Sequence, residues 1–125
     1  MIIASASFAQ ERENLATLEA ALQTEVPRFL CLNENIATGA QPKAEAFAKL
    51  AQQGYRAVLS LRVEKEEGFD LSQDRARAEQ AGLRYIHIPF ATAAPDTQRM
   101  AQFFAAVKEK KNFPMLVYCG SANRV

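Results

Sequence analysis

Apolar residues recur along the chain in two patterns, a spacing of three to four positions and short continuous runs. The first pattern predicts helices, and the second predicts strands that are buried on both faces. Leucines three and four positions apart in residues 11–25 predict a helix that Pro27 ends. The clearest helix begins at Asp96, and its apolar residues share one face: Met100, Phe103, Phe104 and Val107.

Between these two helices, predicted strands alternate with predicted helices. Helices are expected over residues 42–53 and 71–81, because Gly54 and Gly82 are suited to a left-handed stop. Apolar runs predict strands in residues 55–62, 83–89 and 115–118. Residues 29–32 are a short apolar segment, and residues 33–42 are expected to form an irregular strand and turn. This alternation predicts an α/β domain with a mainly parallel sheet flanked by helices. Such sheets bind ligands at the C-terminal ends of their strands.

Length and composition limit the classes of protein that fit. With 125 residues, 49% of them hydrophobic and 23% charged, the chain has the size and balance of one globular domain. The net charge is +1 and no basic block occurs, so we expect neither a nucleic-acid partner nor a membrane partner. Two cysteines and one histidine are too few for the usual structural zinc sites. We therefore expect no metal and no cofactor.

The N-terminal residues 1–9 are small and apolar, and their last three fit the small-x-small pattern that precedes signal cleavage. This favours the remnant of a secretory signal and an exported or periplasmic protein, with a cytoplasmic location as the alternative. Residues 10–125 then form the single domain.

The candidate chemistry lies directly after the last predicted strand. Cys119 is followed by small residues whose backbone N–H groups can converge on one anion: Gly120, Ser121, Ala122 and Asn123. The guanidinium of Arg124 can clamp the same anion, and this positive field favours the nucleophilic thiolate of Cys119. The other interpretation is that Cys119 is a small buried apolar residue and Arg124 is a surface charge.

Several spaced motifs in residues 29–125 resemble the phosphatase-like domain of beta-lactamase hydrolase-like proteins, a bacterial branch related to tyrosine and dual-specificity phosphatases. The motifs are residues 35–42, residues 58–62, Glu66, Glu67, residues 82–89, residues 117–119, Asn123 and Arg124. The resemblance implies a tyrosine-phosphatase-like fold, with Cys119 as nucleophile and Arg124 as phosphate clamp. Arg62 occupies a family-like position at a strand end, where it would assist phosphate binding or pair with a nearby glutamate.

Three features depart from the tyrosine-phosphatase pattern. Four residues separate Cys119 from Arg124, where tyrosine phosphatases have five, and the shorter loop is also that of rhodaneses. Ala122 replaces a glycine. No aspartate follows Pro89 directly, so Asp96 is either the general acid or only the cap of its helix. The chain also ends at Val125, where the family continues into a helix, which predicts a truncated domain.

These observations support three functions. The first is a cysteine-dependent phosphatase that forms a phosphocysteine on Cys119 and acts on a phosphorylated small molecule or a phosphoprotein. The second is a rhodanese-like sulfurtransferase that carries a persulfide on Cys119. The third is a non-catalytic anion-binding module.

Overall fold

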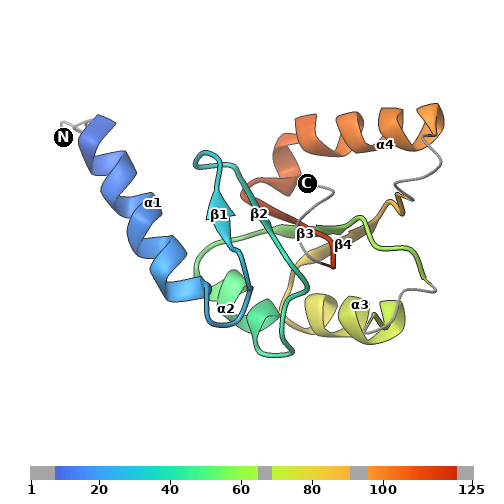
Figure 1. Ribbon diagram of the computed structural model, residues 1–125, viewed down its shortest axis with the longest axis horizontal. Coiled ribbons are helices and arrows are strands. Elements are labelled where there is room, and N and C mark those ends of the chain that lie inside the picture. Colours follow the sequence, from blue (N-terminus) through green and yellow to red (C-terminus); the bar gives the residue numbers. More distant parts are fainter. Residues whose placement is uncertain (1–7, 65–68, 91–95, 121–125) are drawn as a thin grey trace.

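The computed structural model describes residues 8–64, 69–90 and 96–120. Within them, five strands form one sheet in the order β1-β2-β5-β3-β4 (Figure 1). The strands are β1 (Leu30–Cys31), β2 (Ile36–Gly39), β3 (Ala57–Ser60), β4 (Arg84–His87) and β5 (Met115–Tyr118). The edge strand β1 is antiparallel to β2, and all other pairs are parallel. The predicted α/β fold with a mainly parallel sheet is confirmed.

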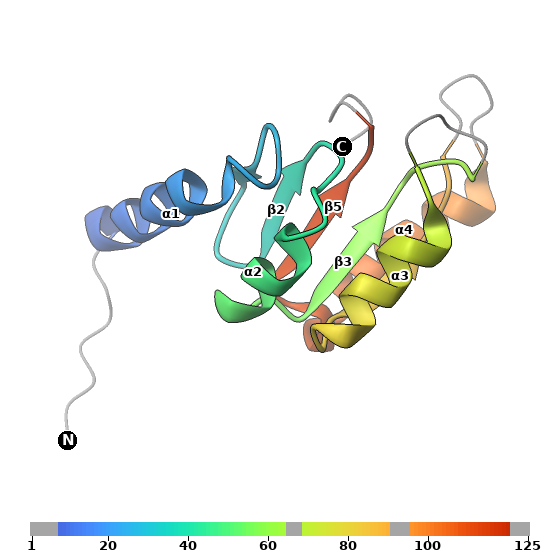
Figure 2. The same cartoon turned by 90° about the horizontal axis from the view of Figure 1, so that it is seen from below.

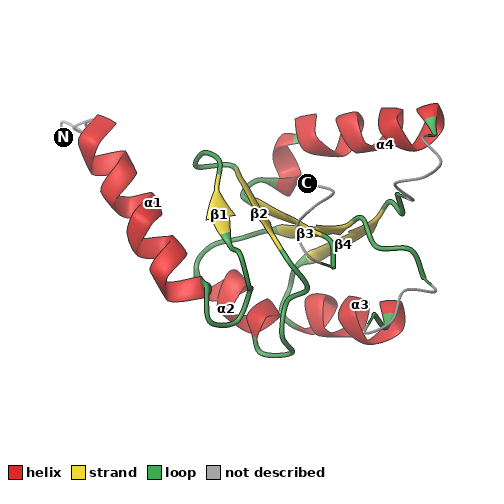
Figure 3. Cartoon of the chain, in the orientation of Figure 1, coloured by secondary structure: helices red, strands yellow, loops and turns green. Residues whose placement is uncertain are grey.

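Helices lie on both faces of the sheet and form a three-layer structure (Figures 1 and 2). One face carries α2 (Ala46–Gln52) and α3 (Leu71–Gln80), and the other carries α4 (Thr97–Lys108). The helix α1 (Phe8–Leu22) extends away beside the β1 edge, and its C-terminal end packs against the α2 side. A short 3-10 helix, η1 (Lys110–Asn112), connects α4 to β5. Figure 3 shows that helices and strands alternate from β2 onward. In the described part of the chain, no helix is long and apolar enough to cross a membrane.

The central strand β5 belongs to two hydrophobic cores, because successive side chains of a strand point to opposite faces. Leu116 and Tyr118 pack in the cluster beneath α1, α2 and α3. Met115, Val117 and Cys119 pack in the second cluster, which includes residues of α4. All four residues of β5 are buried, as are all four of β3. The fully apolar runs in the sequence therefore correspond to the strands covered on both faces.

The helix α2 begins at Ala46, four residues later than the sequence predicted. Pro42 suits a first helical position, but the next residue is held elsewhere: the N–H of Lys43 donates to the carbonyl of Glu25, 2.8 Å away. This contact holds the segment before α2 against the turn that follows α1. The predicted left-handed stops are confirmed, with φ of +89° at Gly54 and +86° at Gly82.

The apolar stripe of α4 is covered only in part. Met100 is 42% exposed and Phe104 is 50% exposed. The partly buried Phe103 and Val107 line an apolar groove of about 170 Å³ against strands β2 and β5. The helix predicted from the apolar spacing is confirmed. The sequence implied that all four apolar residues are buried, but only Phe103 and Val107 are partly buried.

Strand β2 ends in a close contact that constrains its neighbours. A Cβ atom added at Gly39 would lie 2.6 Å from Cγ1 of Val26, and the next residue, Ala40, donates its N–H to the carbonyl of Pro27 at 2.8 Å. Glycine is therefore required here for space, so that residues 26–27 can pack against the end of β2.

We predict that Gly39→Ala lowers the free energy of unfolding by about 1–3 kcal/mol, the usual cost of overpacking. Urea unfolding followed by circular dichroism measures this change. In a Val26→Ala background, Gly39→Ala should lower the free energy of unfolding by clearly less, because the Cγ1 atom of Val26 that the new Cβ would meet is absent. Gly54→Ala is the matched control: its positive φ also makes alanine costly, but that cost should not depend on residue 26. Equal costs of Gly39→Ala in both backgrounds would contradict the steric explanation.

Candidate active site

Cys119 lies at the C-terminal end of the central strand, between the ends of β2 and β3. Its N–H donates to the carbonyl of Gly39 at 3.3 Å. The carbonyl of Gly120 accepts from the N–H of Gln41 at 3.5 Å, and the N–H of Leu61 donates to the carbonyl of Tyr118 at 2.9 Å. Three strand ends therefore hold the start of the cysteine loop. The Cys119 side chain is fully buried, in the cluster on the α4 side of the sheet.

Arg62 is brought to the same place from the end of β3. Its side chain is only 6% exposed, and its Nη1 donates to Oε1 of Gln41 at 2.8 Å. Its Nη2 lies 3.4 Å from the point where a Cβ atom of Gly120 would be. The guanidinium also lies 5.2 Å above the ring of Phe69. A buried cation thus lies against the residue that follows Cys119.

His87, the single histidine, supports this arrangement from β4. Its Nε2 forms a 2.7 Å hydrogen bond with the backbone carbonyl of Arg62. Its ring lies 5.9 Å from the ring of Phe69. In the described part of the chain, these contacts hold the backbone of Arg62 and the aromatic ring below its guanidinium.

Four further residues are linked to the site by hydrogen bonds, and the sequence did not identify them as site residues. Gln41 donates from Nε2 to Oδ2 of Asp74 at 2.8 Å, and Tyr118 donates its hydroxyl to the same oxygen at 2.8 Å. Tyr85 forms a 2.7 Å hydrogen bond with the hydroxyl of Tyr118. One signal was present in the sequence: Asp74 lies one turn before the buried Ala78 of α3, on the face that packs inward. An acidic residue at that position made α3 look only weakly amphipathic.

Burial fixes the protonation of the two tyrosines. It raises the pKa of Tyr118 far above its usual range and raises the pKa of Tyr85 to about 12. Both hydroxyls therefore keep their protons at neutral pH. The Tyr118 O–H group donates its hydrogen bond to Asp74, so it can only accept in its bond with Tyr85. Tyr85 is therefore the donor in the hydrogen bond between the two tyrosines.

Asp96 caps α4. Its Oδ1 accepts from the backbone N–H of Gln98 at 2.9 Å and of Arg99 at 3.4 Å. Its Oδ2 lies 3.7 Å from Nε of Arg99. The helix-cap interpretation is therefore confirmed, while a role as general acid stays a prediction. The other predicted site residues, Ser121, Ala122, Asn123 and Arg124, lie outside the described residues.

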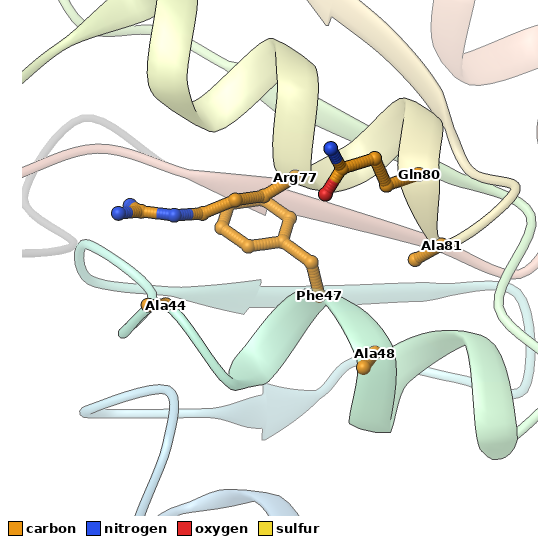
Figure 4. Close-up of a pocket in the computed structure, with 6 residues that line it drawn as sticks. All are labelled: Ala44, Phe47, Ala48, Arg77, Gln80 and Ala81. Atoms are coloured by element: carbon orange, nitrogen blue, oxygen red, sulfur yellow. The ribbon is translucent and has the colours of Figure 1, made fainter.

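A second groove among the described residues lies on the other side of the sheet from the one beside α4. Figure 4 shows this groove between α2 and α3, of about 200 Å³, in which the side chain of Arg77 extends across the ring of Phe47. This groove is on the face of the sheet opposite α4 and carries no nucleophile. Across residues 8–64, 69–90 and 96–120, no cluster of histidine, cysteine or acidic residues could hold a metal ion.

A family model described as "DSP-PTPase phosphatase fused to NAD+ Kinase" matches residues 14–123. The chain is also 30% identical over 99 residues to a beta-lactamase hydrolase-like protein of Xylella fastidiosa strain 9a5c. That match covers 78% of this chain and 23% of the relative, so the chain spans about a quarter of the relative's length. The resemblance expected from the motifs is confirmed.

Solved structures agree on the fold. A protein of Shewanella putrefaciens CN-32 described as "Putative phosphatase (DUF442)" superposes with a TM-score of 0.75 at 22% identity, over 83% of this chain and 68% of that one. The P. aeruginosa protein TpbA, solved in complex with pTyr, superposes with a TM-score of 0.60 at 19% identity, over 76% of this chain and 54% of that one. The tyrosine-phosphatase-like fold is therefore confirmed, and the chain belongs to the family of DSP-PTPase phosphatase domains described as fused to NAD+ kinase.

Proposed function

We propose that the chain hydrolyses phosphate monoesters through a phosphocysteine intermediate on Cys119. The main support is the position of Cys119 at the end of β5, with the guanidinium of Arg62 against the next residue. A cation at this point stabilises the negative charge of a phosphoryl group and of the thiolate that attacks it.

The reaction has two steps. The Cys119 thiolate attacks phosphorus, the bond to the ester oxygen breaks, and the leaving oxygen takes a proton from a general acid. Water then attacks the phosphocysteine, releases inorganic phosphate and restores the thiolate. We assign the phosphate oxygens to the amides of residues 120–123 and to the guanidinium groups of Arg62 and Arg124.

The substrate class follows from the same chemistry. Two cationic side chains and a ring of amides suit a dianionic phosphate group on a small molecule or on a protein side chain. The structure of P. aeruginosa TpbA in complex with pTyr fits a phosphorylated substrate.

We predict that Cys119→Ser abolishes hydrolysis of p-nitrophenyl phosphate, because a serine hydroxyl is not ionised at neutral pH. Cys31→Ser is the matched control and should keep full activity. The second function is tested alongside: a sulfurtransferase would take sulfur from thiosulfate and give thiocyanate with cyanide. Thiocyanate formation without phosphatase activity would favour the persulfide chemistry to which the loop length also points. If neither reaction is observed and phosphate still binds, the anion-binding module is correct.

A second prediction tests whether Cys119 is a nucleophile or only a core residue. In a Cys31→Ser background, iodoacetamide should alkylate Cys119 in the native protein, and inorganic phosphate should slow the reaction. Mass spectrometry of quenched samples gives the rate. Removing Cys31 simplifies the assay, and burial together with the charge of Glu19 already raises the pKa of that thiol. Alkylation no faster than global unfolding would show that Cys119 only fills the core.

The third prediction concerns Asp96, which we propose as general acid in addition to helix cap. Both backbone bonds go to Oδ1, so Oδ2 is the oxygen assigned to proton transfer. Asp96→Asn keeps a good cap and should leave the free energy of unfolding nearly unchanged. It should slow hydrolysis of phenyl phosphate, whose leaving group needs the proton, by about 100-fold. Hydrolysis of p-nitrophenyl phosphate should fall much less. Equal effects on both esters would leave Asp96 as a cap only.

A further inference from the structure

Hydrogen bonds connect the interior of α3 to Arg62, beside the cysteine loop, without a break. They run from Tyr118 to Asp74, from Asp74 to Gln41 and from Gln41 to Arg62, each 2.8 Å long. These residues belong to β5, to α3, to the loop after β2 and to the end of β3. Four segments that are distant in the sequence therefore meet in one polar network.

Most of the network is inaccessible to water. Tyr118 has no exposed surface, and Asp74 is 3% exposed. A buried charge is unfavourable unless hydrogen bonds replace its hydration. Among the described residues, no buried side-chain nitrogen or oxygen lacks a partner. Each group in the network is therefore held in place by its neighbours.

Asp74 determines which end of the Gln41 amide faces Arg62. Oδ2 of Asp74 accepts hydrogen bonds, and only the NH₂ end of the Gln41 amide can donate one to it. The NH₂ group of Gln41 accordingly lies 2.8 Å from Oδ2 of Asp74. The carbonyl end is then turned toward Arg62, and only this end can accept from a guanidinium.

The amide also determines where the charge of Arg62 lies. A direct pair with Asp74 would draw the guanidinium toward α3 through two parallel hydrogen bonds. Nη1 of Arg62 instead donates to the neutral carbonyl oxygen of Gln41, and Nη2 of Arg62 lies beside Gly120. The cation is therefore held at the loop that follows Cys119.

We propose that Gln41 and Asp74 are positioning residues, which hold Arg62 so that its guanidinium binds the phosphate group at the cysteine loop. This inference rests on the proposed phosphate site and deepens it: part of the affinity for phosphate is set by two residues that do not touch the substrate.

Binding of inorganic phosphate, measured by isothermal titration calorimetry, tests this independently of turnover. Gln41→Leu should raise the dissociation constant about tenfold, the scale of one hydrogen bond to a charged group. The KM for p-nitrophenyl phosphate should rise by a similar factor. Gln80→Leu, the same substitution at an exposed position of α3, is the control and should change none of these values.

Two further variants separate positioning from general stability. Asp74→Asn keeps an acceptor oxygen for Gln41 and Tyr118, so phosphate affinity should be retained. In an Arg62→Met background, Gln41→Leu should cause no further loss of affinity, because the group it positions is gone. If Gln41→Leu does not fold, Gln41→Asn, which is too short to reach both partners, replaces it.

The outcomes distinguish this inference from the proposed function. Equal dissociation constants for the wild type and Gln41→Leu, or an undiminished effect in the Arg62→Met background, would overturn the positioning role. A wild-type protein that binds no phosphate would overturn it as well. Phosphate binding with the expected pattern but without any ester hydrolysis would overturn the proposed hydrolysis alone.

Discussion

The pairing of β5 with two parallel neighbours is the constraint on which the rest of the structure depends. Residues 115–118 match residues 36–39 on one side and 57–60 on the other, so three strands end at the same level. Cys119 is the first residue beyond that level. A shift of β5 by one residue would move Cys119 to the other face and exchange the side chains of the two cores. Register thus fixes the position of the proposed nucleophile.

The alternation of side chains along β5 continues into Cys119, so Tyr118 and Cys119 have different roles. Tyr118 points toward α3 and donates to Asp74, whereas Cys119 lies on the face of α4. Adjacent residues therefore connect the sheet to the helix layer on one face and place a thiol on the other. The polar network and the thiol belong to one strand end, although their side chains lie on opposite faces of the sheet.

Much of this arrangement was predictable from the sequence, because it depends on local patterns. The continuous apolar runs predicted β3 and β5, and the alternation of elements predicted the parallel order that brings Arg62 toward Cys119. The start of α2 was predicted wrongly. Proline suits a helix start by its fixed φ, but the contact of Lys43 with Glu25 is made between segments far apart in sequence. Such a contact cannot be predicted from the residues around Pro42 alone.

Gln41 and Asp74 show why a buried polar network is harder to predict than a core. Burial of apolar residues leaves a period in the sequence, whereas a hydrogen bond between residues 33 positions apart leaves none. What remains is a local inconsistency: an acid on the inward face of α3, and an amide at the end of β2. Each is costly if it stands alone, and both become favourable when the fold joins them to Tyr118 and Arg62. An acid in a buried helical position is therefore itself a reason to search the neighbouring strand ends for its partners.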